Sequence, residues 1–376
     1  MAEGAIPAIS LRPRMRRLCF VAPIVFRSPA AVLLVVAVPL AGYLSVIRHA
    51  VTGDRSGSDF LSFWHAGQHV LRLQSPYPIV DALPAVADRT TFEPFVYPAP
   101  AAFGMVPFGV LPFAVAATLL LLLNIASIVV ALRLLGVRDW RCHVVAFATV
   151  PVMASAALGT FSPLLLLGAA AAWRHRDRVS RVGPIVAAVV VTKLFLWPVW
   201  LWLVYTRRYA AAALAAVLGA VVTLGAWALI GFGGLRDYPR LLSRLTELVG
   251  TQSYSPFALL RAEGLGSASA QRAVFAIGFA LLAWIAYALR NDRADEKSFV
   301  AALGVALVLT PILWPHYLVL LYVPIALARK SFSFLWFWPV LLWFDANAWS
   351  YADPKRIVPA LCLTAVPFMH ALRSAE

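Results

Sequence analysis

A lysine inside an apolar run is the residue of this chain that most needs a chemical explanation. Lys193 lies in GPIVAAVVVTKLFLWPVWLWLVY, with no other charge within ten residues on either side. A lysine at the centre of a membrane-spanning helix costs about 2.5–3.5 kcal/mol on insertion scales. A partner in the protein, a water-filled cavity or an anionic ligand offsets this cost, so Lys193 is a candidate for binding a phosphate. A position near a helix end, with the ammonium group reaching the membrane surface, is the alternative.

An aspartate precedes an aromatic-rich segment soon after the first apolar stretch. Asp59 stands in DRSGSDFLSFWHAGQHVL, where Ser56, Gly57 and Ser58 form a lead-in and a helix cap. The apolar residues that follow predict an amphipathic helix lying along the membrane surface. A carboxylate held at that boundary can accept a proton from a hydroxyl group, which is the role of a general base. A capping or solvated aspartate is the alternative interpretation.

A histidine follows a Trp-Pro pair at the start of a predicted span. His316 lies in TPILWPHYLVLLYVP, on the side predicted to face outward. An imidazole can donate a hydrogen bond to a phosphate or carry a proton at physiological pH. A hydrogen-bonded histidine at the membrane interface is the competing interpretation.

Residues of two long polar segments are candidates for substrate contacts. Tyr77 and Tyr97, in SPYP and EPFVYPAP, offer rings for stacking on a sugar or for an aromatic belt at the membrane interface. Glu93, in the same segment, is a weaker acid candidate than the aspartate described above. In the second segment, Arg236 and Arg240 fall on one face of a predicted amphipathic helix. They are expected to meet lipid phosphates, either in a specific site or only as a basic, solvated face.

The composition shows that these residues belong to a membrane protein. The hydrophobic fraction is 62%, the charged fraction 13% and the mean hydropathy +0.81, values outside the range of soluble proteins. The net charge of +15 does not indicate nucleic acid, because most arginines flank apolar stretches. Nucleotide-binding and zinc-protease motifs, Cys/His clusters and DxD pairs are absent from the sequence. We expect no cofactor, and leave a divalent metal open.

The hydrophobic pattern predicts an all-α, polytopic membrane protein. A basic N-terminus, 1–29, precedes one membrane domain, 30–373, and a short tail, 374–376. Segments 51–103 and 232–270 are predicted as outer loops that carry amphipathic helices. The predicted hydrophobic segments, about twelve with several short or broken, are 30–50, 104–132, 143–157, 160–173, 183–192, 194–206, 209–231, 271–289, 298–313, 314–328, 332–349 and 356–372.

The short basic loops predict the orientation of the chain. Five of them fall on one side when the spans alternate from a cytoplasmic N-terminus: RLLGVRDWRCH, WRHRDRVSR, YTRRY, RNDRADEK and ARKS. Lys355 and Arg356 fall on the other side and do not fit this pattern, while the two long loops carry charges of both signs and also face the other side. We therefore predict a multi-pass protein of a bacterial-type inner membrane, with the two outer loops and the candidate site on the periplasmic face.

The landmarks, in their order along the chain, resemble glycosyltransferase family 87. Its members are integral membrane enzymes of the GT-C type, and polyprenol-phosphate-mannose-dependent mannosyltransferases are the best known. The resemblance runs from about Ala30 to about Leu327. It is carried by SDFLSFWHAG, SPYP, FVYPAPAAFGMVPFGVLP, LGTFSPLLLLGAAAAWRHRD, VVVTKLFLWPVWLWL and LTPILWPHYLVLL. This chain reads Gly159-Thr160 where the family often has Gly-Gln.

The resemblance implies a reaction and assigns roles to three residues. A hexose, mannose by default, would pass from a polyprenyl-phosphate sugar to a lipid or glycan acceptor on the non-cytoplasmic face. The family's catalytic aspartate corresponds to Asp59, its histidine to His316 and its buried lysine to Lys193. One base and one anionic leaving group are typical of an inverting displacement.

Two other classes of function fit parts of the sequence. Short, broken spans and a buried lysine also occur in transporters and lipid flippases, which perform no covalent chemistry. A non-catalytic subunit of an envelope-assembly complex is the third hypothesis.

Overall fold

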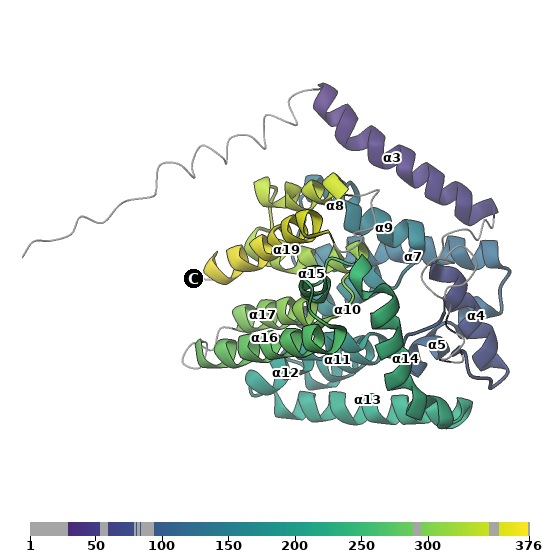
Figure 1. Ribbon diagram of the computed structural model, residues 1–376. Helices are drawn as coiled ribbons and strands as arrows, with labels where there is room; N and C mark the ends of the chain where they lie inside the picture. Colours follow the sequence, from purple (N-terminus) through teal and green to yellow (C-terminus); the bar gives the residue numbers. More distant parts are fainter. Residues whose placement is uncertain are drawn as a thin grey trace, which may run out of the picture.

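The computed structural model describes residues 29–52, 59–78, 80, 83, 94–288, 295–345 and 353–374. Within these ranges all regular secondary structure is helical (Figure 1), which confirms the all-α prediction. The first elements are α3 (Pro29–Thr52), α4 (Asp59–Leu71), α5 (Ala99–Gly104), α6 (Val106–Gly109), α7 (Phe113–Leu134), α8 (Trp140–Phe147), α9 (Val150–Leu158), α10 (Ser162–Arg174) and α11 (Val179–Thr192). The later ones are η3 (Leu194–Leu196), α12 (Pro198–Tyr205), α13 (Tyr209–Ile230), α14 (Gly233–Val249), η4 (Gly250–Gln252), α15 (Pro256–Ala262), α16 (Ser267–Ala288), α17 (Asp295–Leu309), η5 (Pro315–Leu321), α18 (Tyr322–Ala328), η6 (Phe334–Asp345) and α19 (Pro354–Ser374).

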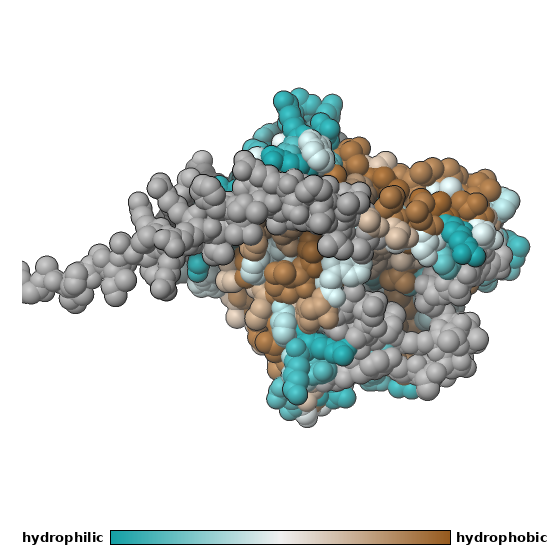
Figure 2. Space-filling model, turned by 90° about the horizontal axis from the view of Figure 1, so that it is seen from above, coloured by the Kyte–Doolittle hydropathy of each residue, from teal (hydrophilic) through white to brown (hydrophobic). Residues whose placement is uncertain are grey.

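Several helices have the length and composition of membrane spans. Among the described residues, α7, α13 and α16 are long and apolar enough to cross a membrane. The pair α8 and α9, bent by 60° at a short break, makes a fourth candidate. In Figure 2, broad hydrophobic patches lie on the surface between hydrophilic ones. Because large apolar side chains exposed in such numbers suit a lipid environment, these findings show a membrane protein. The count of about twelve segments stays a prediction.

One predicted span, 104–132, begins later in the structure. The continuous helix α7 starts only at Phe113, after Pro112, and two short helices, α5 and α6, precede it. Proline and glycine interrupt the backbone here although the residues between them are apolar. Gly109 is needed for packing, because a Cβ there would lie 2.9 Å from the backbone of Gly67 in α4.

Two pairs of short helices enclose the candidate site. α11 ends at Thr192 and α12 begins at Pro198, so the chain breaks around Lys193, where the sequence predicts two half-length helices. The second pair is η5 and α18, and a Trp-Pro pair starts η5 just as one starts α12. The rings of Phe195 and Tyr317 stack with their centroids 5.2 Å apart, which joins the two breaks.

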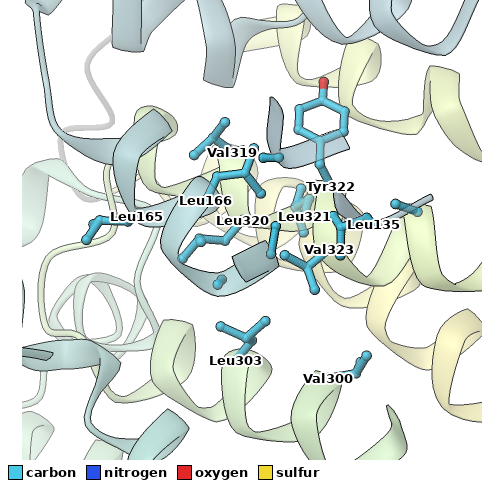
Figure 3. Packing of buried hydrophobic residues seen from close by; sticks show 14 of the residues in the cluster. Leu135, Leu165, Leu166, Val300, Leu303, Val319, Leu320, Leu321, Tyr322 and Val323 are labelled. Atoms are coloured by element: carbon cyan, nitrogen blue, oxygen red, sulfur yellow. The ribbon is translucent and has the colours of Figure 1, made fainter. Parts of the chain in front are cut away.

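The main hydrophobic core surrounds η5 and the start of α18. Figure 3 shows Val319, Leu320 and Leu321 packed between Leu166 of α10 and Leu303 of α17. These side chains are at most 1% exposed. A core of this density fixes the start of η5, where His316 lies.

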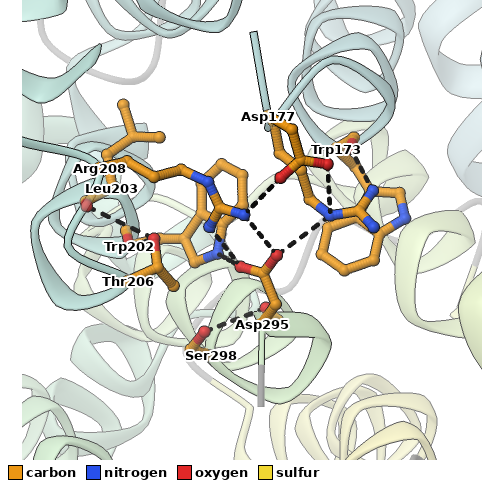
Figure 4. A network of polar contacts seen from close by, with 9 residues as sticks. Trp173, Asp177, Trp202, Leu203, Thr206, Arg208, Asp295 and Ser298 are labelled. Carbon is orange, nitrogen blue, oxygen red and sulfur yellow. Dashed lines mark hydrogen bonds and ion pairs between the residues drawn. The ribbon is translucent and has the colours of Figure 1, made fainter. Parts of the chain in front are cut away.

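Three of the predicted basic loops meet in one ionic network (Figure 4). Asp295 accepts hydrogen bonds from both terminal nitrogens of Arg208, at 2.6 and 2.7 Å, and from Arg176 at 3.0 Å. The indole nitrogen of Trp202 donates to the same carboxylate at 3.2 Å. Arg208 also donates to Asp177 at 2.9 Å. The loops after α10 and α12 and the start of α17 therefore lie together.

The other two basic loops are joined in the same way. Asp139, which caps α8, accepts a hydrogen bond from the backbone N–H of Phe332 at 3.1 Å. Its carboxylate also pairs with the guanidinium of Arg141 at 2.8 Å. Glu296 of α17 interacts electrostatically with both Lys330 and Arg176, which connects this pair of loops to the network around Asp295. Described residues in or next to each of the five predicted basic loops thus lie together.

Candidate active site

Helix α4 holds Asp59 at its first residue. Phe63 of α4 stacks on Phe161 with ring centroids 4.3 Å apart, and the indole nitrogen of Trp64 donates to the carbonyl of Leu111 at 3.0 Å. Gly159 adopts a positive φ of 66°, and a Cβ at that position would lie 2.7 Å from the Cβ of Phe60. The turn before α10 therefore packs directly on α4, and the aromatic face of α4 fixes its N-terminus. The predicted cap, Ser56–Ser58, lies outside the described residues.

Lys193 sits in a cage of aromatic rings. Its side-chain nitrogen lies 3.6 Å from the ring centroid of Tyr317, 4.7 Å from that of Tyr97 and 6.0 Å from that of Phe195. The same nitrogen donates a hydrogen bond to the Tyr97 hydroxyl at 3.2 Å. Lys193 is only 7% exposed. Aromatic faces attract a cation, and the attraction strengthens when water is excluded. The cage holds the ammonium group at the break between α11 and η3.

The Asp59 carboxylate belongs to the same site. It interacts electrostatically with Lys193 and with Tyr317. The hydroxyls of Tyr97 and Tyr317 are also hydrogen-bonded to each other. Segments far apart in the sequence therefore place a carboxylate, an ammonium group and two phenols together.

His316 is buried beside this group with both ring nitrogens available. It is 2% exposed, and neither nitrogen has a hydrogen-bond partner among the described residues. The ring packs edge-on against Tyr317, with centroids 4.6 Å apart, and interacts electrostatically with Lys193. An unpaired buried imidazole costs free energy unless a ligand completes its hydrogen bonds. His316 is thus equipped to bind a polar group in the site.

Two further tyrosines hold the loop that carries Tyr97. The Tyr77 hydroxyl donates to the carbonyl of Tyr97 at 2.7 Å, and the Tyr238 hydroxyl donates to the carbonyl of Val96 at 3.0 Å. The ring of Tyr77 stacks on Trp227, with centroids 5.0 Å apart and an interplanar angle of 15°. Burial raises the pKa of both tyrosines above its ordinary value, so both hydroxyls remain protonated donors.

Three of the predicted site residues remain. Glu93 lies outside the described residues. Arg236 and Arg240 are exposed on α14, roughly opposite Tyr238, which faces the interior. Their role in substrate contact stays a prediction.

Sequence reasoning missed several members of the site. Tyr317, Phe195, Tyr238 and Trp227 are ordinary residues for a membrane protein, where aromatic side chains are common at the interface. Tyr317 alone had a signal, since it directly follows His316 in the Trp-Pro-His-Tyr turn.

A cavity opens beside Phe60, the residue that follows Asp59. It has a volume of about 270 Å³ and lies between α3, α7, the end of α9 and the start of α4. Phe60, Phe113 and Leu120 line it, with Ser45 and His49 of α3. The cavity therefore offers both polar and apolar surface close to the start of α4.

Comparison with known families identifies the reaction class. The model of glycosyltransferase family 87 matches residues 95–315, more than half of the chain. The chain belongs to glycosyltransferase family 87. The matched range contains Tyr97 and Lys193, while Asp59 precedes it and His316 directly follows it. No curated protein and no solved structure matches the chain.

Membership of family 87 makes this protein a glycosyltransferase with a sugar donor and an acceptor. It favours the enzymatic hypothesis over a transporter, a lipid flippase or a non-catalytic subunit. Glycosyltransferases of this type generally need no cofactor. In the part of the chain that the structure describes, no group of three His, Cys, Asp or Glu side chains is arranged to hold a metal ion.

Proposed function

We propose that this glycosyltransferase moves a hexose, mannose in the first instance, from a polyprenyl-phosphate sugar to a hydroxyl group of a lipid or glycan acceptor. The observation that carries the proposal is the caged ammonium group of Lys193 beside the Asp59 carboxylate. A buried cation next to a carboxylate suits a reaction in which an anion leaves while a proton is taken up. A lipid phosphate supplies such an anion from within the membrane.

The mechanism follows from the chemistry of these groups. Asp59 accepts the proton of the acceptor hydroxyl as that oxygen forms its bond to the anomeric carbon. The bond from the anomeric carbon to the phosphate oxygen breaks, and its electron pair stays on the phosphate. Lys193 and an N–H of His316 stabilise the charge that develops there. One displacement from the face opposite the leaving group inverts the anomeric carbon.

The position of the site relative to the basic loops supports a non-cytoplasmic active site. Helix α13 begins at Tyr209, next to Arg208 of the ionic network, and near its end Trp227 stacks on Tyr77. Its 22 residues span about 33 Å at 1.5 Å per residue, the thickness of a membrane core. Basic loops remain cytoplasmic in most membrane proteins. The site at the other end of α13 then faces the periplasm of a bacterial-type cell.

The test is transfer by purified, reconstituted protein. Radiolabelled polyprenyl-phosphate mannose and a membrane lipid extract are supplied to the wild type and to Asp59→Asn. We expect a labelled product from the wild type, and a turnover roughly 10²–10⁴-fold lower from the variant, the usual effect of losing a general base. Asp237→Asn, which changes an exposed aspartate of α14, is the matched control and should keep wild-type turnover.

Two results would count against the proposal. Equal turnover in the wild type and in Asp59→Asn would remove Asp59 from the mechanism. Absence of product from the wild type with mannose, other hexoses and pentoses on the same lipid phosphate would exclude this class of donor.

A further inference from the structure

The segment Pro94–Pro98 carries Tyr97 without the support of regular secondary structure. Helix α5 begins only after it, at Ala99, and proline lacks the backbone N–H that would help to satisfy neighbouring carbonyls. Buried carbonyl groups nevertheless need donors. The Tyr77 and Tyr238 hydroxyls supply them, to the consecutive carbonyls of Tyr97 and Val96.

The two donors come from different parts of the chain. Tyr77 follows α4, whereas Tyr238 lies in α14, where it is 8% exposed. Trp227, at the end of α13, contacts both rings, with centroids 5.0 Å from Tyr77 and 6.0 Å from Tyr238. Gly234 makes room for this contact, because a Cβ there would lie 2.5 Å from the Trp227 ring. The two predicted outer loops are therefore fastened to each other through these rings.

We propose that Tyr77 and Tyr238 are positioning residues, whose hydroxyls fix the backbone of Val96 and Tyr97 so that the Tyr97 side chain holds Lys193. The chain of contacts is continuous: Tyr238 to Val96, Tyr77 to Tyr97, and the Tyr97 hydroxyl to Lys193 at 3.2 Å. Through it, the placement of α14 determines the placement of the ammonium group. The predicted effect on sugar transfer rests on the proposed function, whereas the predicted effect on the exposure of Lys193 does not.

The first test measures the exposure of Lys193 without any substrate. An amine-reactive reagent labels the reconstituted protein, and mass spectrometry follows each lysine. Lys330 and Lys355 are exposed and serve as internal references. Tyr238→Phe keeps the ring contacts and removes one hydrogen bond, so local opening and the labelling rate of Lys193 should rise about fivefold. Tyr77→Phe should act in the same direction.

The matched control for this test is Tyr322→Phe. The Tyr322 hydroxyl also bonds a backbone carbonyl, that of Ala146 at 3.2 Å, but it does so in the core around α18. Its loss should leave the labelling ratio of Lys193 to the exposed lysines unchanged. An unchanged ratio in Tyr238→Phe and in Tyr77→Phe would overturn the proposal, and so would an equal rise in the control.

The second test is a double-mutant cycle on sugar transfer. Tyr238→Phe alone should lower kcat about fivefold, as expected for one buried hydrogen bond. If Tyr238 acts through Tyr97, the same change should have little further effect in a Tyr97→Phe background. Equal effects in both backgrounds would contradict a positioning role. Should the wild type transfer no sugar, the proposed function fails while the labelling result still decides the positioning proposal.

Discussion

Lys193 combines burial with surroundings that leave its charge usable. The faces of Tyr97 and Tyr317 replace water around the ammonium group. One of its N–H groups donates a hydrogen bond to the Tyr97 hydroxyl. An ammonium group has three N–H donors, so it can also bind a phosphate oxygen. We therefore expect that burying this charge, although it costs free energy, serves to bind the phosphate in the reaction.

Replacing Lys193 should move activity and stability in different directions. Lys193→Met keeps the length of the side chain and removes its charge. We expect kcat to fall roughly 10²–10³-fold, the usual effect of losing one group that stabilises developing charge. The melting temperature should stay the same or rise, because an apolar side chain needs no compensation for burial. Transfer assays and thermal unfolding of the same preparations measure both effects.

The control for that substitution is Lys330→Met, an exposed lysine at the basic end of the molecule. It should leave kcat within the error of the assay. Normal turnover by Lys193→Met would show that the charge is not needed for the reaction. Unfolding of this variant at a much lower temperature would show that Lys193 has a structural role.

Single residues of the site were predictable when their type was unusual for their surroundings. Lys193 and His316 stand out in apolar sequence, and in the structure Lys193 interacts electrostatically with both Asp59 and His316. Tyr317 and Tyr238 do not stand out, because their function depends on which face of a ring meets which partner. That information lies in the tertiary structure, since the segments concerned are far apart in the chain.

Among the helices, breaks were predictable where a polar residue or a Trp-Pro pair marks them. The sequence indicates the break between α11 and α12, and the structure has it at Lys193. The predicted span 104–132 includes the short helix α6, because its apolar residues conceal the effect of Pro107 and Pro112. Close packing of α6 against α4 decides this geometry, and periodicity does not report such packing.

The cap of α8 gives a test of a helix end through pH. A hydrogen bond from the Arg141 side chain, aided by the backbone N–H groups of Phe332 and Arg141, outweighs burial and lowers the pKa of Asp139 to about 2. The ordinary pKa of an aspartate is about 3.9. Stability from this carboxylate is thus fully present above about pH 4 and is lost as pH falls through about 2.

Asn keeps a capping oxygen but removes the charge that pairs with the partly exposed Arg141. We therefore expect Asp139→Asn to unfold at a lower temperature than the wild type at pH 5, by the equivalent of about 1 kcal/mol. The difference should shrink steadily between pH 4 and pH 2. Thermal unfolding in detergent across this range measures it. A difference that is constant from pH 5 to pH 2 would show that the charge of Asp139 contributes nothing to the stability of α8.

In the molecule as a whole, α13 separates two regions held together by different interactions. Aromatic rings and tyrosine hydroxyls join the elements near Trp227, whereas the ionic network around Asp295 joins those near Tyr209. The site residues lie in the first region. Changes in the ionic network should consequently affect stability more than catalysis.

Asp295→Asn tests this separation. Arg208 and Asp295 have side chains only 20% and 26% exposed, so the loss of charge leaves a half-buried guanidinium poorly paired. We expect a loss of about 1.5–3 kcal/mol in unfolding free energy, the range for hydrogen bonds to charged groups. Transfer at temperatures well below unfolding should remain near the wild-type rate.

The comparison variant for the network is Asp353→Asn, whose partner Arg356 lies 3.7 Å away and whose pair is 42% exposed on both sides. An exposed pair of this kind contributes little, so this variant should unfold like the wild type. Equal melting temperatures for Asp295→Asn and Asp353→Asn would show that the network does not hold the helices together.

The cage around Lys193 has a consequence for biosynthesis. Tyr97 is translated before the lysine, but Tyr317 and Phe195 follow it, and Tyr317 emerges only after α13, α14 and α16. We therefore expect the half-helices α11 and α12 to enter the membrane while the charge between them lacks its nearest ring. At that moment the insertion cost of a lysine, about 2.5–3.5 kcal/mol, is not yet offset. We therefore expect the nascent chain to need the translocation machinery to hold α11 and α12 until the second Trp-Pro segment arrives.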